Sequence, residues 1–289
     1  MKFFVLGCNG MAGHIISLYL KEQGHDVLGF AMEKSNLVNN VVGDARDTES
    51  LRKIIKEGHF DSVINCIGIL NQFAEQKKAL ATFLNSYFPH FLADVTDGTD
   101  TQVIHMSTDC VFSGKRGEYT EEDFCDGETF YDRSKALGEL EDDKNITLRN
   151  SIVGPDINSN GIGLLNWFMK STAGEAEHRL NGFTKAMWTG QTTLQLAKTM
   201  EAAAKEKAHG LYNTVPDHSI SKCELLKLFD KYFRDGKDII TPVEGVNADK
   251  SLKRMHFDFG YLIPDYEDMV RELAEWTIKH KDLYPHYVL

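Results

Sequence analysis

The 289-residue sequence predicts an α/β fold, a doubly wound parallel sheet followed by a smaller C-terminal lobe. Three observations predict it. Short apolar runs alternate with helical patterns across residues 1–150, as they do in the strands and crossover helices of a parallel sheet. A glycine-rich turn directly follows the first apolar run. The alternation then becomes irregular after Asn150, where Gly154-Pro155 breaks the chain.

The first half of the chain supplies the strands of this sheet. Residues 2–6 form an apolar run that suits a buried parallel strand, and a helix over residues 14–22 follows the glycine-rich turn. The other expected strands cover residues 25–31, 40–43, 60–66, 102–106 and 146–149. The other expected helices begin near residue 48, cover residues 80–95 and begin again within residues 129–139. We therefore assign residues 1–150 to one sheet domain.

The second half, residues 151–289, reads as a smaller lobe over the carboxyl ends of the strands. Its expected elements are helices over residues 163–170, 192–207, 221–233 and 265–280 and a strand over residues 210–215. Thr192 is a candidate N-cap for the helix over residues 192–207, which we expect to pack back on the sheet domain. A lobe in this position would close a cleft at the strand ends, where open α/β sheets bind ligands.

Composition and charge limit the classes of function. The formal net charge of −11 argues against a general binder of nucleic acids or anionic membranes. No apolar run has the length of a transmembrane helix, so we expect a cytoplasmic protein with no membrane partner. The five cysteines lack C-x-x-C spacing and the histidines are scattered, which predicts reduced thiols and no dedicated metal site.

The glycine-rich turn has the pattern G-x-x-G-x-x-G between a predicted strand and a predicted helix. Gly7 allows the tight turn, Gly10 lets the backbone approach a pyrophosphate, and Gly13 lets the helix pack closely on the strand. Asn9 and Met11 lie in the same turn, and the helix N-terminus adds free N–H groups. The pattern predicts a Rossmann-like domain that binds NADPH or NADH.

Further cofactor contacts are expected at the carboxyl ends of the next strands. Lys34 follows the second strand and would either meet a 2′-phosphate, favouring NADPH, or be a solvated loop residue. Asp44, with Ala45 beside it, would either hydrogen-bond the adenine or cap the helix that begins near Thr48. The end of the fourth strand is expected to line the same groove through Cys66, Ile67 and Gly68.

Tyr131 and Lys135 stand four residues apart at the start of a predicted helix and therefore share one face. A cation about 4 Å from a phenol, at an effective dielectric of about 20, is worth about 4 kcal/mol, which would lower a pKa of about 10 toward neutrality. We therefore expect Tyr131 to act in acid–base chemistry with help from Lys135. The strand over residues 102–106 delivers Thr108 and Asp109 to the edge where ligands bind.

Together these segments resemble the extended short-chain dehydrogenase/reductase superfamily, and within it the dTDP-4-dehydrorhamnose reductase family. The matching motifs are Gly7-x-x-Gly10-Met11-x-Gly13, Ser107-Thr108-Asp109-x-Val111-Phe112-x-Gly114, Tyr119-x-Glu121 and Tyr131-x-x-Ser134-Lys135-Ala136-Leu137-Gly138-Glu139. The resemblance implies reduction, by NADPH or NADH, of the 4-keto group of a nucleotide-linked 6-deoxyhexose for surface polysaccharide synthesis. It implies that Thr108 orients the carbonyl and that Tyr131 donates the proton. Lys135 would lower the phenol's pKa and hold the nicotinamide ribose.

Departures from the family pattern fall near the expected sugar-nucleotide pocket. Cys110 stands where the family commonly has tyrosine, and Trp188-Thr189-Gly190 stands where many relatives carry a Pro-Thr pair. Trp188 would either stack on a base or sugar or pack within the lobe. The substrate-binding residues that we expect are Thr108, Asp109, Cys110 and Trp188. The substrate stays open between a dTDP-4-dehydrorhamnose-like sugar and a UDP-linked 2-acetamido-2,6-dideoxy-4-ketohexose.

Other functions on this scaffold remain as alternatives. A sugar-nucleotide epimerase with tightly held NAD would keep the same tyrosine and lysine. A 4,6-dehydratase would need a glutamate where Cys110 stands. A regulatory subunit similar to the beta subunit of methionine adenosyltransferase would bind the cofactor without turnover. The sequence is also compatible with a homodimer.

Overall fold

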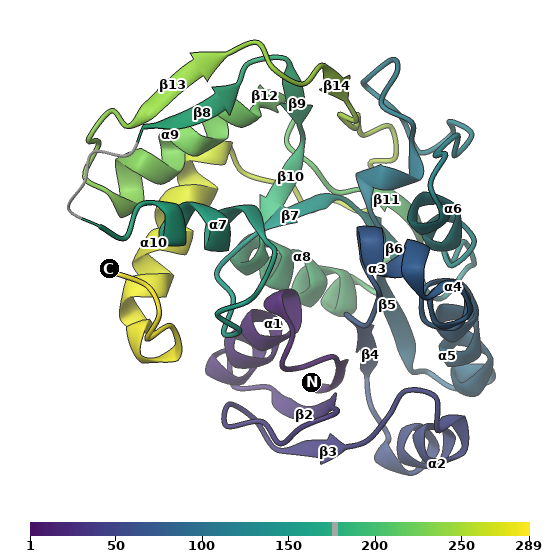
Figure 1. Cartoon of the computed structure of the whole chain (residues 1–289). Coiled ribbons are helices and arrows are strands. Elements are labelled where there is room, and N and C mark those ends of the chain that lie inside the picture. Colours follow the sequence, from purple (N-terminus) through teal and green to yellow (C-terminus); the bar gives the residue numbers. More distant parts are fainter. Residues whose placement is uncertain (175–178) are drawn as a thin grey trace.

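The computed structural model describes residues 1–174 and 179–289 and is built on a 7-stranded parallel sheet (Figure 1). The strands stand in the order β11-β6-β5-β4-β1-β2-β3. They are β1 (Lys2–Leu6), β2 (Asp26–Ala31), β3 (Asn40–Val42), β4 (Ser62–Asn65), β5 (Gln102–Met106), β6 (Ile146–Arg149) and β11 (Gly210–Asn213). The chain runs outward from β1 to β3 and then returns to place β4 on the other side of β1. The predicted doubly wound, Rossmann-like fold is therefore confirmed, with its topological switch point between β1 and β4.

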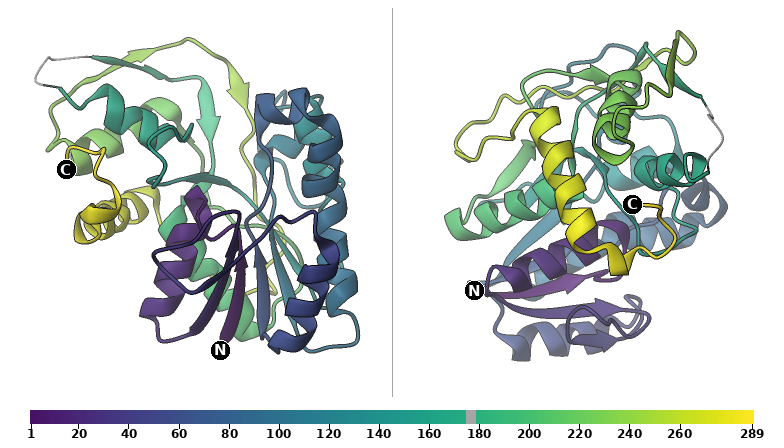
Figure 2. Two further views of the ribbon diagram at one scale, coloured as in Figure 1. Left: turned by 60° about the horizontal axis from the view of Figure 1, so that its bottom comes forward. Right: turned by 90° about the vertical axis from the view of Figure 1, so that its left-hand side faces the viewer.

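The central strand β1 is buried on both faces, which explains its unbroken apolar sequence. Phe3 and Val5 belong to the core under α1 (Met11–Glu22) and α8 (Thr193–Glu206). Phe4 and Leu6 belong to the core under α2 (Thr48–Gly58) and α5 (Phe88–Thr96). Figure 2 shows helices on both sides of the sheet. Alternating side chains of one strand thus supply both cores.

Side-chain caps set the beginnings of several helices. The Thr192 hydroxyl caps α8, as expected. Thr129 and Asp132 form a capping box at the start of α6 (Phe130–Ala136). Asp47 caps α2, so the alternative role of Asp44 as its cap is wrong, and the Asp44 carboxylate is left for other partners.

The single helix expected over residues 80–95 is interrupted. It consists of α4 (Lys78–Ala81), a π-helical turn η1 (Thr82–Tyr87) and α5, and α3 (Asn71–Gln76) precedes it. The turn carries Asn85, which is fully buried. Its amide nitrogen donates to the Ile69 carbonyl and to the Ser134 hydroxyl, each at 3.0 Å, and its amide oxygen accepts from the Ile69 N–H at 2.9 Å. Asn85 thereby ties the loop after β4 to α6.

The lobe packs around one apolar core formed by α7 (Leu164–Ser171), α9 (Lys222–Phe233) and α10 (Tyr266–Lys279). Small sheets join its segments: β7 (Ser151–Val153) with β10 (Gly190–Thr192), β9 (Ala186–Trp188) with β12 (Ile220–Ser221) and β14 (Ala248–Asp249), and β8 (Leu180–Phe183) with β13 (Ile240–Val243). Two elements of the second half, α8 and β11, return to the main sheet (Figure 1). Within the described ranges, none of the helices has the length and apolar character needed to cross a bilayer.

Candidate functional site

The glycine-rich turn between β1 and α1 is tightly packed. Gly7 has a φ of 84°, in the left-handed region that favours glycine. A Cβ atom on Gly13 would lie 2.1 Å from the Gly7 carbonyl oxygen, so only glycine allows α1 to approach the turn this closely. Gly10 is the N-cap of α1 and brings no side chain. The first N–H groups of α1 therefore remain available to an anionic ligand.

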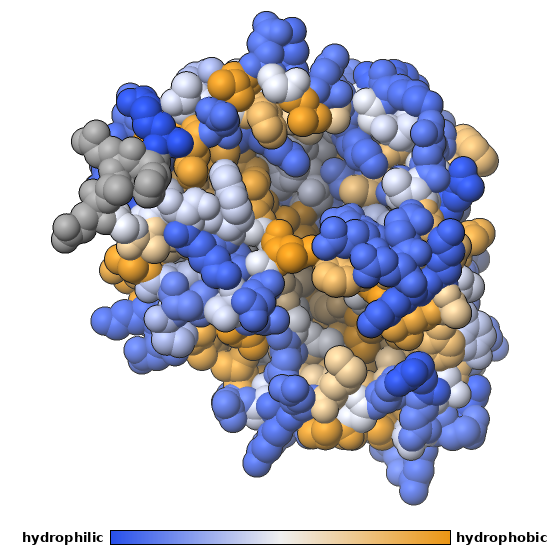
Figure 3. Space-filling model, viewed as in Figure 1, coloured by the Kyte–Doolittle hydropathy of each residue, from blue (hydrophilic) through white to orange (hydrophobic). Residues whose placement is uncertain are grey.

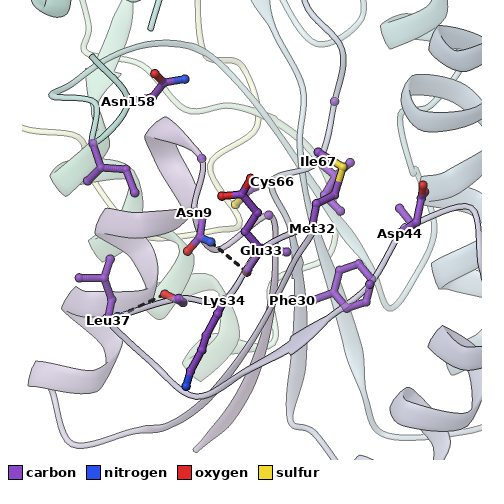
Figure 4. Close-up of a pocket in the computed structure, with 18 of the residues that line it drawn as sticks. Asn9, Phe30, Met32, Glu33, Lys34, Leu37, Asp44, Cys66, Ile67 and Asn158 are labelled. Carbon is purple, nitrogen blue, oxygen red and sulfur yellow. Dashed lines mark hydrogen bonds between the residues drawn. The ribbon is translucent and has the colours of Figure 1, made fainter. Parts of the chain in front are cut away.

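A cavity of about 1240 Å³ extends from this turn along the carboxyl ends of β2, β3 and β4 (Figure 4). Most of the predicted cofactor residues line it, namely Gly7, Asn9, Gly10, Lys34, Asp44, Ala45, Cys66, Ile67 and Gly68. Met11 and Gly13 do not, because Gly13 packs against the turn itself and the Met11 sulfur lies against Gly163. We call this cavity the groove.

Charged side chains lie around the groove at the ends of β2 and β3. The Asp44 carboxylate accepts hydrogen bonds from the Arg46 side chain, with Nε at 3.0 Å, and these bonds lower the pKa of Asp44. In Figure 4 the Lys34 side chain extends away from Asn9 and Cys66, whereas Glu33 lies beside Asn9. The Asn9 amide donates to the Glu33 carbonyl at 3.2 Å. Asp44, the acid that follows β3, is therefore ionised and paired with Arg46. The sequence did not suggest Arg46 as its partner.

Other wall residues of the groove also carried no recognisable signal. They include Phe30, Arg46, Ile157, Asn158, Asp282, Leu283 and Pro285. Residues 157–158 follow the Gly154-Pro155 break, and residues 282–285 follow α10. Neither segment has a motif or a strand end to mark it, and tertiary packing alone brings both to the groove.

Thr108 and Tyr131 meet near the carboxyl end of β5. Thr108 follows β5 and caps the short 3₁₀ helix η2 (Asp109–Val111), accepting from the Cys110 N–H at 3.1 Å and donating to Asp109 Oδ1 at 3.0 Å. Tyr131 lies in the first turn of α6, close enough to the Thr108 side chain for Thr108 to affect its pKa. The two residues are only 9% and 6% exposed. We call Thr108 and Tyr131 the polar pair.

The electrostatics of Tyr131 differ from the sequence-based expectation. Burial raises the pKa of Tyr131, the neighbouring Cys110 adds to the rise, and the nearby Thr108 side chain opposes it. The Lys135 ammonium donates instead to the Met106 carbonyl at 2.7 Å. Burial lowers the pKa of Lys135 to about 8, and Glu139 and Cys66 act in the opposite direction. Tyr131 is therefore a protonated phenol at neutral pH, and the expected lowering of its pKa by Lys135 is not observed.

Of the other expected substrate residues, Asp109 and Cys110 follow Thr108 in η2, whereas Trp188 lies in the lobe core. Burial raises the pKa of Asp109, and the nearby Lys250 partly offsets that effect. Burial raises the pKa of Cys110 to about 12, so its thiol is neutral. Trp188 is only 5% exposed and packs against Tyr266 with 5.4 Å between ring centroids. The expectation that Trp188 stacks on a ligand is wrong, because its ring lies inside the lobe core.

The groove extends toward α6, the helix that carries Tyr131 and Lys135. Cys66 lines the groove and is also close enough to Lys135 to affect its pKa. The face of the molecule in Figure 3 is hollowed near its centre, with apolar residues around the hollow. Among the residues that the structure describes, no cluster of three or more histidine, cysteine or acidic side chains is arranged to hold a metal ion.

The chain is similar to two proteins that are named as reductases. It is 36% identical over 143 residues to the probable low-salt glycan biosynthesis reductase Agl14 of Haloferax volcanii, across 48% of each chain. It is 28% identical over 144 residues to the dTDP-4-dehydrorhamnose reductase of Mycobacterium tuberculosis, across 48% of this chain and 44% of that one. The chain thus spans about half the length of the curated relatives it matches.

A solved structure and a family profile extend the likeness over more of the chain. The dTDP-4-dehydrorhamnose reductase of Bacillus anthracis in complex with NADP superposes with a TM-score of 0.79 at 19% identity, covering 96% of this chain and 99% of that one. At this identity the superposition shows the shared fold. The profile described as the RmlD substrate binding domain matches residues 1–256. The chain therefore belongs to the RmlD substrate binding domain family, and the membership that its motifs indicated, in the dTDP-4-dehydrorhamnose reductase family of extended short-chain dehydrogenases/reductases, is confirmed.

Proposed function

We propose that this chain is an NADPH- or NADH-dependent reductase of the 4-keto group of a nucleotide-linked 4-keto-6-deoxyhexose, acting in the synthesis of surface polysaccharide precursors. The observation that carries the proposal is a groove that begins at the glycine-rich turn and reaches Cys66, close to α6, where the buried Tyr131 lies near Thr108. Relatives named as a glycan biosynthesis reductase and as dTDP-4-dehydrorhamnose reductases support it.

The residues of the groove fit a dinucleotide. Gly13 lies so close to Gly7 that no side chain fits on Gly13. The N–H groups at the start of α1 can therefore face a phosphate of the dinucleotide. Asp44 is ionised and exposed at the end of β3, where it can accept hydrogen bonds from an adenine amino group. Residues 1–150 would hold most of the cofactor, and residues 151–289 would mainly cover the substrate. When bound, the reduced nicotinamide supplies a hydride to the sugar carbonyl carbon.

Tyr131 and Thr108 act on the carbonyl oxygen. Because the pKa of Tyr131 is raised, the phenol carries its proton at neutral pH and gives it to the oxygen as negative charge develops there. The Thr108 hydroxyl orients that oxygen and stabilises the charge. Lys135, protonated below about pH 8, would hold the nicotinamide ribose. Asp109 and Cys110 border the sugar.

The same geometry argues against a 4,6-dehydratase. That reaction needs a base for the C5 proton and an acid for the C6 hydroxyl, and relatives place an aspartate–glutamate pair directly after the threonine. Cys110 occupies the position of the glutamate, and its thiol, with a pKa of about 12, is neutral and a poor substitute for a carboxylate. The site therefore favours reduction over dehydration.

The decisive experiment measures NADPH and NADH consumption with dTDP- and UDP-linked 4-keto-6-deoxysugars, including the 2-acetamido form, and identifies the products. One equivalent of cofactor consumed per alcohol formed is the expected result. Interconversion of sugars without net consumption, with NAD retained through purification, would instead show an epimerase. Tight cofactor binding with no conversion of any sugar would show a regulatory subunit.

A further inference from the structure

The groove has one wall that lies outside the family match. Asp282, Leu283 and Pro285 line it together with Gly10, and they follow α10, beyond the matched residues 1–256. The chain here forms the 3₁₀ turn η3 (Lys281–Leu283) and then lies against α1 (Figure 2). We call residues 281–287 the closing segment.

A hydrogen-bond chain links the closing segment to that turn. His14 Nδ1 lies 2.9 Å from the Gly10 carbonyl oxygen, and His14 Nε2 lies 2.9 Å from the Tyr284 hydroxyl. A carbonyl can only accept, so Nδ1 carries the imidazole proton and Nε2 accepts from Tyr284. His14 is fully buried, and burial lowers its pKa to about 4, so the imidazole stays neutral around pH 7. Tyr284 is thereby fixed to the turn in a single orientation.

A second contact links the closing segment to the lobe. The Tyr287 hydroxyl accepts a hydrogen bond from the Asp156 N–H at 3.0 Å, and the rings of Tyr287 and Tyr284 stack with their centroids 5.5 Å apart. Ile157 and Asn158, which follow Asp156, line the same groove. The two tyrosines therefore hold the closing segment between α1 and the loop that forms the neighbouring wall.

The chemistry of this wall indicates what it contributes. Its lining residues are one acid and two apolar side chains, Asp282, Leu283 and Pro285, which bring no positive charge to a phosphate. The N–H groups at the start of α1 remain the phosphate donors. The closing segment can therefore act by excluding water from those N–H groups and by fixing the turn, both of which strengthen a hydrogen bond to an anion.

We propose that residues 281–287 are a cofactor-binding element of this chain, which closes the groove over the glycine-rich turn and holds the turn in place through Tyr284 and His14. The inference rests on the proposed function in one respect, namely that the groove takes NADPH or NADH. It predicts that losing a single hydroxyl, distant from the reacting carbon, weakens binding of the dinucleotide.

The test measures the dissociation constants of NADPH and NADH by nicotinamide fluorescence for the unchanged protein, Tyr284→Phe and the matched control Tyr266→Phe. Tyr266 is as buried as Tyr284, at 1% exposed, and its hydroxyl donates to the His218 carbonyl at 2.6 Å, in the lobe and away from the residues lining the groove. Tyr284→Phe should weaken binding about three- to tenfold, as expected for one buried hydrogen bond. Tyr266→Phe should bind as the unchanged protein does.

Hydrogen exchange on the unchanged protein gives a readout that needs no variant. Saturation with NADPH should slow exchange of the amides in residues 281–287 as well as those of the glycine-rich turn. If the protein binds either dinucleotide but shows no such slowing, and Tyr284→Phe binds equally well, the closing segment has no role in binding while the proposed function stands. If the protein binds neither dinucleotide, the proposed function fails and this inference fails with it.

Discussion

The Lys135 ammonium lies 3.5 Å from Nε2 of His105, and both side chains are buried. Asn65 determines which nitrogen of that histidine carries the proton. The Asn65 amide oxygen accepts from the Ile67 N–H at 3.1 Å, so its amide nitrogen donates to His105 Nδ1, also at 3.1 Å. The histidine proton is then on Nε2 and faces Lys135. The ammonium donates to the Met106 carbonyl. It is buried and faces another N–H donor, and burial lowers the pKa of Lys135.

Replacing Lys135 by methionine should stabilise the fold while it removes activity. Burial lowers the pKa of Lys135 from 10.5 to about 8, which corresponds to a penalty of about 3 kcal/mol for the ammonium in the folded protein. The penalty is complete below pH 8. It disappears between about pH 8 and 10.5, because there the unfolded chain binds the proton that the folded protein has released. At pH 7, Lys135→Met should therefore raise the free energy of unfolding by up to about 3 kcal/mol.

Urea unfolding at pH 7 and at pH 9.5 checks this, with the unchanged protein as the reference at each pH. The gain in the free energy of unfolding from Lys135→Met should shrink at the higher pH, because Lys135 of the folded, unchanged protein has then lost most of its charge. The other titrating groups near Lys135, including Glu139 and Cys66, are present in both proteins, so their effects cancel. A variant that is less stable at both pH values would show that the ammonium is stabilised in the fold and that the account of its burial is wrong.

Removing the phenol hydroxyl with Tyr131→Phe should abolish most of the turnover and leave cofactor affinity unchanged. A general acid contributes about 10²- to 10⁴-fold, so kcat should fall by at least the lower of these factors. Steady-state kinetics with the active 4-ketosugar and a dissociation constant for NADPH measure the two effects separately. A rate close to that of the unchanged protein would refute Tyr131 as the proton donor.

The central strands of the main sheet could be predicted because they are buried on both faces. β5 and β6 begin and end where their apolar runs do, and the helices capped by Thr192 and Thr129 begin where expected. The interrupted helix around Asn85 could not be predicted. Its cause is a set of hydrogen bonds to Ile69 and Ser134, residues that only the folded chain brings close.

Some residues of the candidate site could also be predicted from the sequence, and others could not. Groove residues such as Cys66 and Asp44 were predictable, because parallel topology brings the carboxyl ends of all strands to one edge. Trp188 was misassigned because the sequence does not show which face of a lobe strand is buried, and here that face packs on Tyr266. The wall supplied by Leu283 comes from a segment without any motif, so only the tertiary structure could reveal it.

Lys34 should affect the choice between the two nicotinamide cofactors. It lines the groove at the end of β2, and its side chain is exposed and extends away from Asn9 in Figure 4. Hydrogen bonds to charged groups are worth about 1.5–3 kcal/mol, so Lys34→Ala should weaken NADPH binding about tenfold or more and leave NADH binding unchanged. Titrations with both cofactors at low and high salt would measure this. Unchanged binding of both cofactors would identify Lys34 as a solvated loop residue, and equal losses for both would show that it does not recognise the 2′-phosphate.

Gly13→Ala should disrupt both the glycine-rich turn and cofactor binding. The added Cβ would lie 2.1 Å from the Gly7 oxygen and 2.8 Å from the Gly7 carbonyl carbon, both backbone atoms, so α1 must move away from the turn. Forced overpacking of this kind costs about 1–3 kcal/mol, and the displaced N–H groups should lose most of their affinity for a pyrophosphate.

Gly260→Ala is the matched control, because a Cβ there meets nothing within 4 Å. Thermal unfolding and NADPH titration of both variants measure the two effects. If Gly13→Ala binds NADPH as well as Gly260→Ala does, the pyrophosphate does not sit on this turn.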